Sequence, residues 1–179
     1  MPLAQRAAPR PSWPRAAFVR LLPRAALFAA ALALAAPAGA QELVVRRLQA
    51  VTFAAAHEAV LDAIAAEGIA PPTESDFGGM LARTAPDLGH RADFYAEARL
   101  INFCSSPLAA RMAAESPHQL LYCPLQIAVY RLPDDAGAVY LGYRRSAPTA
   151  AGRAAETLLE AILNRSAAEL GRSLPGVAP

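Results

Sequence analysis

The chain has 179 residues with 17 basic and 15 acidic side chains, and every basic residue apart from histidine is an arginine. Five arginines and no acids fall in residues 1–40, so the other 139 residues carry 12 arginines against 15 acids and a net charge of −3. This acidic balance argues against nucleic acid as a partner, because binding phosphates needs a concentrated cationic face.

The first 40 residues have the three parts of a secretory signal peptide. A basic region over 6–24 is followed by a twelve-residue apolar core over 25–36, and Ala38 and Ala40 form an Ala-x-Ala cleavage site. Twelve apolar residues span about 18 Å as a helix, short of the ~30 Å hydrocarbon core of a bilayer. We therefore expect cleavage after Ala40, a periplasmic or secreted protein, and no stable membrane anchor afterwards.

The mature chain begins with a strand and a helix. The aliphatic segment 43–51 predicts a first strand, and Thr52 can cap a helix over 53–67, in which apolar residues recur at helical spacing. Gly68 is well placed to end this helix. His57 lies on the apolar stripe, where we expect it to pack at the edge of the core.

A short helix is expected over 77–85, with Ser75 or Asp76 as its cap. Gly78 and Gly79 lack both the Lys-Ser/Thr sequel and the preceding strand of a phosphate-binding loop. We interpret these glycines as residues that permit close backbone packing.

Residues 94–144 predict three strands and one helix. A strand over 94–104 precedes a helix over 107–115, and strands over 125–132 and 138–144 are separated by the turn-forming sequence PDDAG. The last two strands therefore form a hairpin.

The C-terminal segment, 147–179, is expected to be a linker and an amphipathic helix over 153–171. Its apolar stripe is wide and needs a surface to cover, either the domain's own sheet or a second subunit. We thus divide the chain into a signal peptide over 1–40, a domain over 41–146 and this C-terminal part. The order of elements predicts an α+β fold, a two-layer sandwich with about four mainly antiparallel strands and helices on one face.

Several short motifs, in this order and spacing, resemble the domain of unknown function 302 family over residues 45–145. They are Phe103-Cys104-Ser105, Met112, Tyr122-Cys123-Pro124, Val129-Tyr130 and Gly142-Tyr143-Arg144-Arg145. The two cysteines stand where more typical members have a glycine-containing turn and a Leu-Pro pair, and the chain looks like a two-cysteine branch. The resemblance implies a two-layer α/β fold that is often dimeric, and it implies no established reaction.

Cys104 and Cys123 are the only cysteines, and their role has four interpretations. In an exported protein a structural disulfide is the default, and it would close a loop of 20 residues and stabilise the fold by about 3 kcal/mol. The pair could instead serve thiol redox or sulfur-handling chemistry. With His118 it could hold copper or zinc. The fourth interpretation is two unrelated buried thiols.

Three further residues are candidates for contact with a ligand or anion: His118, Tyr143 and Arg144. Adjacent strand residues face opposite ways, so only one of Arg144 and Arg145 should share a face with Tyr143. Tyrosines cluster on and near the hairpin, where they could line a groove or interface, and cross-strand packing explains them equally well.

These observations together predict an exported, non-enzymatic binding or accessory domain with a structural disulfide. We expect a homodimer with an unknown small ligand or protein partner and no cofactor. The competing hypotheses are a thiol redox protein and a metal carrier.

Overall fold

The computed structural model describes residues 43–174, so the signal peptide expected over residues 1–40 lies outside the described residues. Five strands form one antiparallel sheet in the order β1-β5-β4-β3-β2. The elements, in chain order, are β1 (Leu43–Gln49), α2 (Phe53–Ala66), β2 (Thr73–Asp76), α3 (Phe77–Thr84), the 3-10 helix η1 (Pro86–Leu88), β3 (Glu97–Phe103), α4 (Ser106–Glu115), the 3-10 helix η2 (Pro117–Tyr122), β4 (Leu125–Arg131), β5 (Ala138–Arg144) and α5 (Ala150–Glu169).

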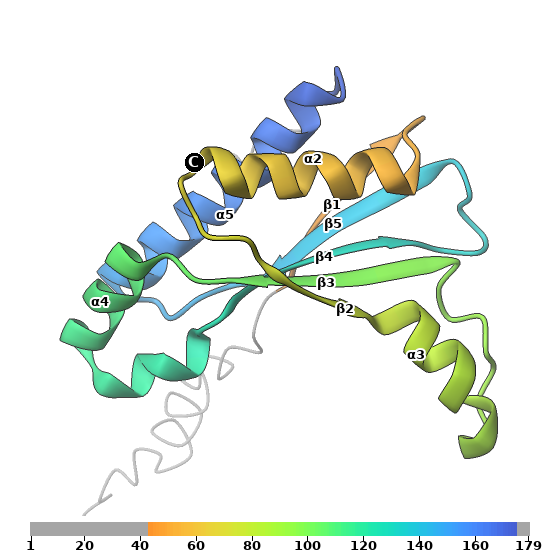
Figure 1. Ribbon diagram of the computed structural model, residues 1–179, viewed down its shortest axis with the longest axis horizontal. Coiled ribbons are helices and arrows are strands. Elements are labelled where there is room, and N and C mark those ends of the chain that lie inside the picture. The colour runs from red at the N-terminus through yellow and green to blue at the C-terminus, as the bar shows by residue number, and fades with distance from the viewer. Residues whose placement is uncertain (1–42, 175–179) are drawn as a thin grey trace, which may run out of the picture. The chain divides into compact units, whose positions relative to one another are not determined.

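The two long helices, α2 and α5, lie together on one face of the sheet (Figure 1). The strands send alternate side chains to this face, because successive residues of a strand point to opposite sides. On β4 these are Leu125, Ile127 and Val129, which are buried in the core cluster. The helices complete that cluster with residues such as Val60 and Leu159.

Helix α5 belongs to the same core as the sheet. Leu159, Ile162 and Leu163 are almost fully buried, and the buried hydroxyl of Ser166 donates to the carbonyl oxygen of Ala59 on α2 at 3.2 Å. The wide apolar stripe of this helix therefore closes the domain's own sheet.

Two predicted helix caps are confirmed. The hydroxyl of Thr52 accepts a 3.2 Å hydrogen bond from the amide of Ala55, and the carboxylate of Asp76 accepts one of 3.0 Å from the amide of Gly79. Side chains of this kind satisfy amides that have no partner inside the first turn. The predicted hairpin of β4 and β5 is confirmed as well.

The glycines at the start of α3 serve close packing, as the sequence predicted. A Cβ added at Gly78 would lie 2.8 Å from the amide nitrogen of Ala98 on β3, and one at Gly79 would lie 2.2 Å from the Asp76 carboxylate. The absence of a side chain thus lets α3 approach the sheet and receive its cap.

The α+β class and the antiparallel sheet are confirmed, but the expected number of strands was wrong by one. The missed strand is β2, a four-residue edge strand that pairs with β3. All four of its residues, Thr-Glu-Ser-Asp, are exposed. A strand whose residues are all polar and exposed has no apolar alternation to reveal it.

The segment expected as a linker after β5 is tied to the rest of the domain. The carboxylate of Glu115, the last residue of α4, accepts a 2.7 Å hydrogen bond from the amide of Ala151 in the first turn of α5. Thr149 caps the same helix by accepting from the amide of Gly152 at 3.1 Å.

Within residues 43–174, no helix is both long enough and apolar enough to cross a membrane.

Candidate functional site

The sheet face that α2 and α5 leave uncovered carries a groove of about 250 Å³. On β4 its lining residues are Gln126, Ala128 and Tyr130, which alternate with the core residues of the same strand. Side chains from five other segments surround them: Leu43, Val45, Phe77, Tyr95, Leu100 and Arg144.

Small residues on neighbouring strands make the floor of this groove. Ala128 on β4 pairs with Gly142 on β5, and Ala98 on β3, which pairs with Tyr130, lines the same face. A Cβ at Gly142 would lie 3.1 Å from the carbonyl oxygen of Val44, so the glycine lets β1 and β5 meet with nothing projecting into the groove. The groove therefore exists because the side chains on this part of the sheet face are small.

Aromatic rings form one wall. Phe77 and Tyr95 meet edge to face with ring centroids 5.9 Å apart, Tyr95 meets Tyr130 in the same way at 5.8 Å, and Tyr130 stacks on Tyr140 at 5.1 Å. Burial is the main cause of the raised pKa of Tyr130, and the neighbouring Tyr95 and Tyr140 raise that pKa further. Tyr130 therefore keeps its phenolic proton at neutral pH and presents a ring and a neutral hydroxyl.

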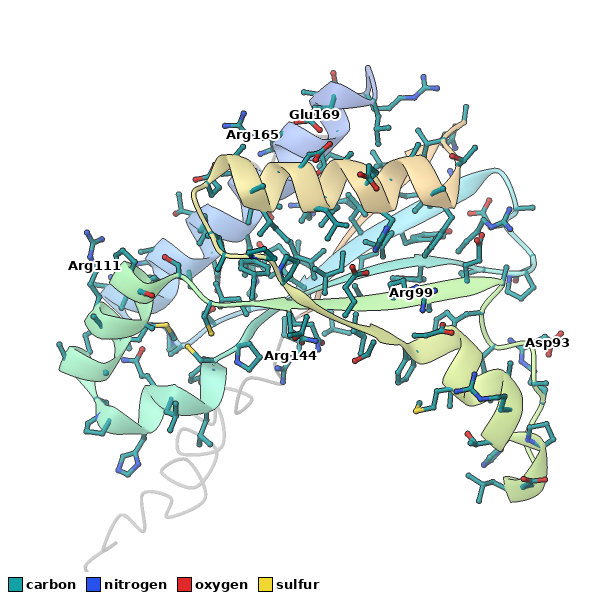
Figure 2. The ribbon with its side chains drawn as sticks, viewed as in Figure 1. Asp93, Arg99, Arg111, Arg144, Arg165 and Glu169 are labelled. Atoms are coloured by element: carbon teal, nitrogen blue, oxygen red, sulfur yellow. The ribbon has the colours of Figure 1, made fainter. Side chains whose placement is uncertain are left out.

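Arg144 supplies positive charge at the rim of the groove. It is the exposed last residue of β5, and Figure 2 shows it on the side of the sheet away from α2 and α5. Within residues 43–174 its guanidinium has no ion-pair or hydrogen-bond partner. Arg99 also borders the groove, but its guanidinium is paired with Asp76 at 3.0 Å. Arg144 is thus the lining arginine whose charge is available to a ligand.

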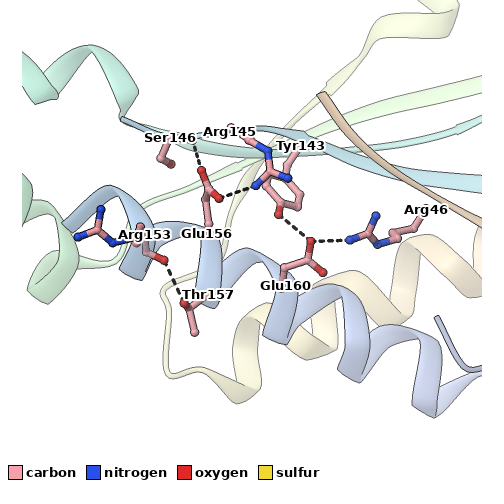
Figure 3. A network of polar contacts seen from close by, with 8 residues as sticks. All are labelled: Arg46, Tyr143, Arg145, Ser146, Arg153, Glu156, Thr157 and Glu160. Carbon is pink, nitrogen blue, oxygen red and sulfur yellow. Dashed lines mark hydrogen bonds and ion pairs between the residues drawn. The ribbon is translucent and has the colours of Figure 1, made fainter. Parts of the chain in front are cut away.

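The side chain of Tyr143 points to the helical side of the sheet, as strand alternation requires (Figure 3). Its hydroxyl donates a 2.7 Å hydrogen bond to Oε1 of Glu160 on α5, and Arg46 of β1 donates to the same oxygen at 2.9 Å. Burial, together with the Glu160 carboxylate, raises the pKa of Tyr143 well above its ordinary value. Tyr143 therefore joins the sheet to α5, and Arg145, its neighbour in the chain, pairs with Glu156 at 2.8 Å.

His118 lies apart from the groove on the exposed surface of η2. Within the described range 43–174, no three His, Cys, Asp or Glu side chains gather closely enough to hold a metal ion together. The three-ligand copper or zinc site, which was one of the alternatives for Cys104, Cys123 and His118, is therefore not formed by the described residues.

The predicted structural disulfide is not supported, because Cys104 and Cys123 are both free thiols. Cys104 is exposed and Cys123 is partly buried. Burial raises the pKa of the Cys123 thiol, and the charge of Cys104 and a hydrogen bond with it raise that pKa further. No disulfide therefore joins the two thiols.

A contact that the sequence did not predict links α2 to the edge strand β2. Nε2 of His57 lies 2.5 Å from Oε2 of Glu74, and the imidazole also stacks on Phe53 with ring centroids 6.1 Å apart. His57 therefore packs at the edge of the core, as expected, and also anchors β2.

The arrangement defines a class: a small two-layer α+β domain with a groove on the open face of its sheet. A family model described as "Domain of unknown function DUF302" matches residues 44–175, and the chain belongs to this family. The match includes α5, beyond the residues that carried the resemblance, and it distinguishes no two-cysteine branch.

A solved structure supports the fold. The crystal structure of an uncharacterized conserved protein DUF302 from Bacillus stearothermophilus is similar with a TM-score of 0.51 and 19% sequence identity, covering 75% of this chain and 99% of that chain. No curated protein matches the sequence.

The sequence analysis named Arg144 as a possible ligand contact and offered a tyrosine-lined groove as one alternative, but it did not identify the floor of the groove. The sequence did contain an indication of the groove: Ala98, Ala128 and Gly142 are small residues on three different strands. In the sheet, all three lie on the face that α2 and α5 do not cover. The order of the strands in the sheet is needed to see that these three positions lie close together and form the floor of one groove.

Proposed function

We propose that this domain is a non-catalytic binding protein that works outside the cytoplasm and holds a small anionic amphiphile in the sheet-face groove. The ligand has a flat apolar body and one carboxylate or sulfonate group. The observation that carries the proposal is the guanidinium of Arg144, unpartnered among residues 43–174, at the rim of an apolar, aromatic-lined groove.

The groove supports a ligand of modest size. Its volume of about 250 Å³ lies just below the roughly 300–1,000 Å³ of pockets that enclose drug-sized molecules. The apolar body would displace water from Leu100, Ala128 and the ring of Tyr130, which is favourable at about 25 cal/mol per Å² of apolar surface removed from water.

The charge at the rim supports an anionic group on the ligand. A guanidinium is planar and can donate two parallel hydrogen bonds to a carboxylate or sulfonate. Arg144 is exposed, so it is accessible before the ligand arrives. The amide of Gln126 also lines this part of the groove, and its nitrogen donates to Asn102 at 2.9 Å, which orients the amide oxygen.

A non-catalytic role is supported by the chemistry of the lining. The titratable groups that reach the groove are phenols and guanidiniums, and the raised pKa of Tyr130 removes it as a base at neutral pH. Likewise the raised pKa of Cys123 is opposite to the lowered pKa of catalytic thiols, which weakens the thiol-exchange hypothesis. Work outside the cytoplasm is supported by the leader pattern over residues 1–40.

Two fluorescent probes of nearly the same shape test the proposal: anionic 1-anilinonaphthalene-8-sulfonate and neutral N-phenyl-1-naphthylamine. The mature chain should bind both. Arg144→Gln should weaken the anionic probe about 3–10-fold, since an exposed charge-assisted contact is lost, and leave the neutral probe unchanged.

Arg111→Gln is the matched control. Arg111 is also an exposed arginine without a partner among residues 43–174, but it lies on α4, far from the groove in Figure 2. It should leave both affinities unchanged. The proposal fails if neither probe binds, or if the two arginine variants weaken the anionic probe equally.

A further inference from the structure

Polar residues form a row across one end of the open sheet face. Asn102 on β3 pairs with Gln126 on β4. Gln126 and Arg144 each lie two residues from the pair of Ala128 and Gly142, which joins the antiparallel strands β4 and β5, so they occupy facing positions. Residues that face one another across antiparallel strands point to the same side of the sheet. An amide pair therefore lies beside Arg144 in the sheet.

The side chains of this row border the same space. Gln126 and Arg144 both line the groove of about 250 Å³, and both also line a smaller hollow of about 20 Å³. Figure 2 shows Arg144 on the side of the sheet away from α2 and α5, which is the side that the groove occupies. One group of a bound ligand can therefore reach both side chains.

The amide of Gln126 offers a hydrogen-bond acceptor to the groove. Its nitrogen Nε2 donates to Oδ1 of Asn102 at 2.9 Å, and its oxygen Oε1 accepts no hydrogen bond within residues 43–174. The side chain is half-buried, and a ligand over it would remove the oxygen from water. A polar atom that loses water without gaining a partner costs free energy. A ligand that covers Gln126 must therefore supply an N–H or O–H donor.

The rows beyond the polar one are apolar and then aromatic. Gly142, Ala128 and Leu100 face one another in the second row, and Tyr140 and Tyr130 face one another in the third. Two residues of a strand advance about 7 Å, so the third row lies about 13 Å from the polar row. A ligand whose polar group lies at Arg144 and Gln126 thus extends its apolar body over the small residues toward the rings.

Arg144 and Gln126 together select the polar group of the ligand. A guanidinium donates to a carboxylate, and Oε1 of Gln126 accepts from a donor. Side chains at facing strand positions start only about 5 Å apart, so the carboxylate and the donor must be close together in the ligand. An α-amino acid with an acyl group on its nitrogen carries an N–H and a carboxylate on one carbon atom. A fatty acid has the carboxylate without the donor.

We propose that the groove ligand is an N-acyl α-amino acid with a flat apolar acyl group. Its carboxylate contacts Arg144 and its N–H donates to Oε1 of Gln126, while Asn102 is a positioning residue that holds the amide of Gln126. This inference rests on the proposed function and narrows its ligand class.

Two fluorescent probes that differ only at the nitrogen test the inference. Dansylglycine has a naphthalene body, a carboxylate and a sulfonamide N–H one carbon from that carboxylate, and dansylsarcosine has a methyl group in place of this hydrogen. In fluorescence titration the mature protein should bind dansylglycine about 3–10-fold more tightly, since only dansylglycine donates to Gln126. Gln126→Met keeps the length of the side chain and removes the acceptor, so it should bind the two probes equally.

Three further variants locate the preference. Gln49→Met, at an exposed glutamine of β1 that does not line the groove, should keep it. Asn102→Leu should reduce it, because the amide of Gln126 is no longer held. Asn102→Asp retains the acceptor for Nε2 of Gln126 and should keep the preference, although its added charge weakens both probes alike. Circular dichroism shows whether each variant is folded.

The inference is overturned if the wild type binds the two dansyl probes equally or binds neither. It is also overturned if Gln126→Met keeps the preference, because the methyl group of dansylsarcosine then acts through its bulk alone. The anilinonaphthalene probe and Arg144→Gln test the proposed function separately. If they behave as expected while the dansyl probes bind equally, the groove takes an anion and only this narrower ligand class fails.

Discussion

The hydroxyl of Tyr143 donates a 2.7 Å hydrogen bond to the carboxylate of Glu160, and this contact ties β5 to α5. Arg46 of β1 completes the group at 2.9 Å (Figure 3). A residue chosen from the sequence as a candidate ligand contact thus joins three elements of the fold.

Removing the Tyr143 hydroxyl should destabilise the domain. Tyr143→Phe deletes a partly buried hydrogen bond to a charged group, which is worth about 1.5–3 kcal/mol. Urea unfolding followed by circular dichroism measures this loss. Tyr122→Phe is the control, because that hydroxyl has no hydrogen-bond partner within residues 43–174, and it should change the free energy of unfolding by less than about 0.5 kcal/mol.

Gly152 should not tolerate a side chain. An added Cβ would lie 1.9 Å from the carbonyl oxygen of Ala147, so Gly152→Ala forces the backbone before α5 to move. We expect a loss of about 2–3 kcal/mol in urea unfolding, larger than the ~1 kcal/mol that alanine gains in helix propensity. Gly137→Ala should be nearly neutral, since nothing lies within 4 Å of its Cβ position. Equal effects of the two changes would contradict this packing.

Helix α5 should be essential to the core. Leu159→Ala removes a side chain that is 1% exposed and should cost about 2–5 kcal/mol. The same deletion at Leu120, which is 73% exposed, should cost less than about 0.5 kcal/mol. If Leu159→Ala were as mild as Leu120→Ala, α5 would not pack on the sheet in solution.

Asp135 should make stability depend on acid pH. Its carboxylate accepts two hydrogen bonds from Arg47, at 2.8 and 2.7 Å, and one from the hydroxyl of Tyr140. The hydrogen bonds from Arg47 have the largest effect and that from Tyr140 the next largest, and together they lower the pKa of Asp135 from 3.8 to about 2. A carboxylate with a lowered folded-state pKa stabilises the fold above its unfolded-state pKa, and this contribution is lost as the pH falls through about 4 toward about 2.

Asp135→Asn should therefore destabilise the protein near neutral pH, and its difference from the wild type should shrink over that acid range. Unfolding measured at several pH values checks this, and carbon-13 NMR titration reads the carboxyl directly. Asp134→Asn, in the same turn, is the control: Asp134 is exposed and has no hydrogen bond or ion pair within residues 43–174, so its replacement should change the stability near neutral pH little. A normal titration of Asp135 would show that its contacts with Arg47 and Tyr140 do not persist in solution.

Filling the groove should block both naphthalene probes. Ala128→Leu places a larger side chain on the groove floor, so we expect each affinity to fall about tenfold, as when a bulky group enters a ligand pocket. Ala113→Leu, at an exposed position on α4, should leave both probes unchanged. Fluorescence titration measures both variants, and retention of full binding by Ala128→Leu would place the probes elsewhere.

Local patterns predicted most elements of the fold. The helix after Thr52 was expected from its capping residue and from the helical spacing of its apolar residues. The hairpin around Asp135 was expected from its turn-forming sequence, and each of these patterns is local in the chain. β2 was missed because its four residues are all polar and exposed, so the strand shows no apolar alternation, and its pairing with β3 leaves no signature in its own sequence.

The candidate sites were less accessible from the sequence. The cysteine count and the leader led to the expectation of a disulfide, yet both sulfurs are free. Residues from six segments meet in the groove, and no spacing along the chain relates Leu43 to Tyr95 or Arg144.

The sequence by itself determined the α+β class, the starts of α2 and α3 and four of the five strands, because these depend on interactions between near neighbours. Only the tertiary structure decided which strands adjoin, and therefore that Ala98, Ala128 and Gly142 make one floor, that Tyr143 turns toward Glu160, and that Arg144 faces the other side. Those outcomes depend on the sheet register, which arises when distant segments bury a common core.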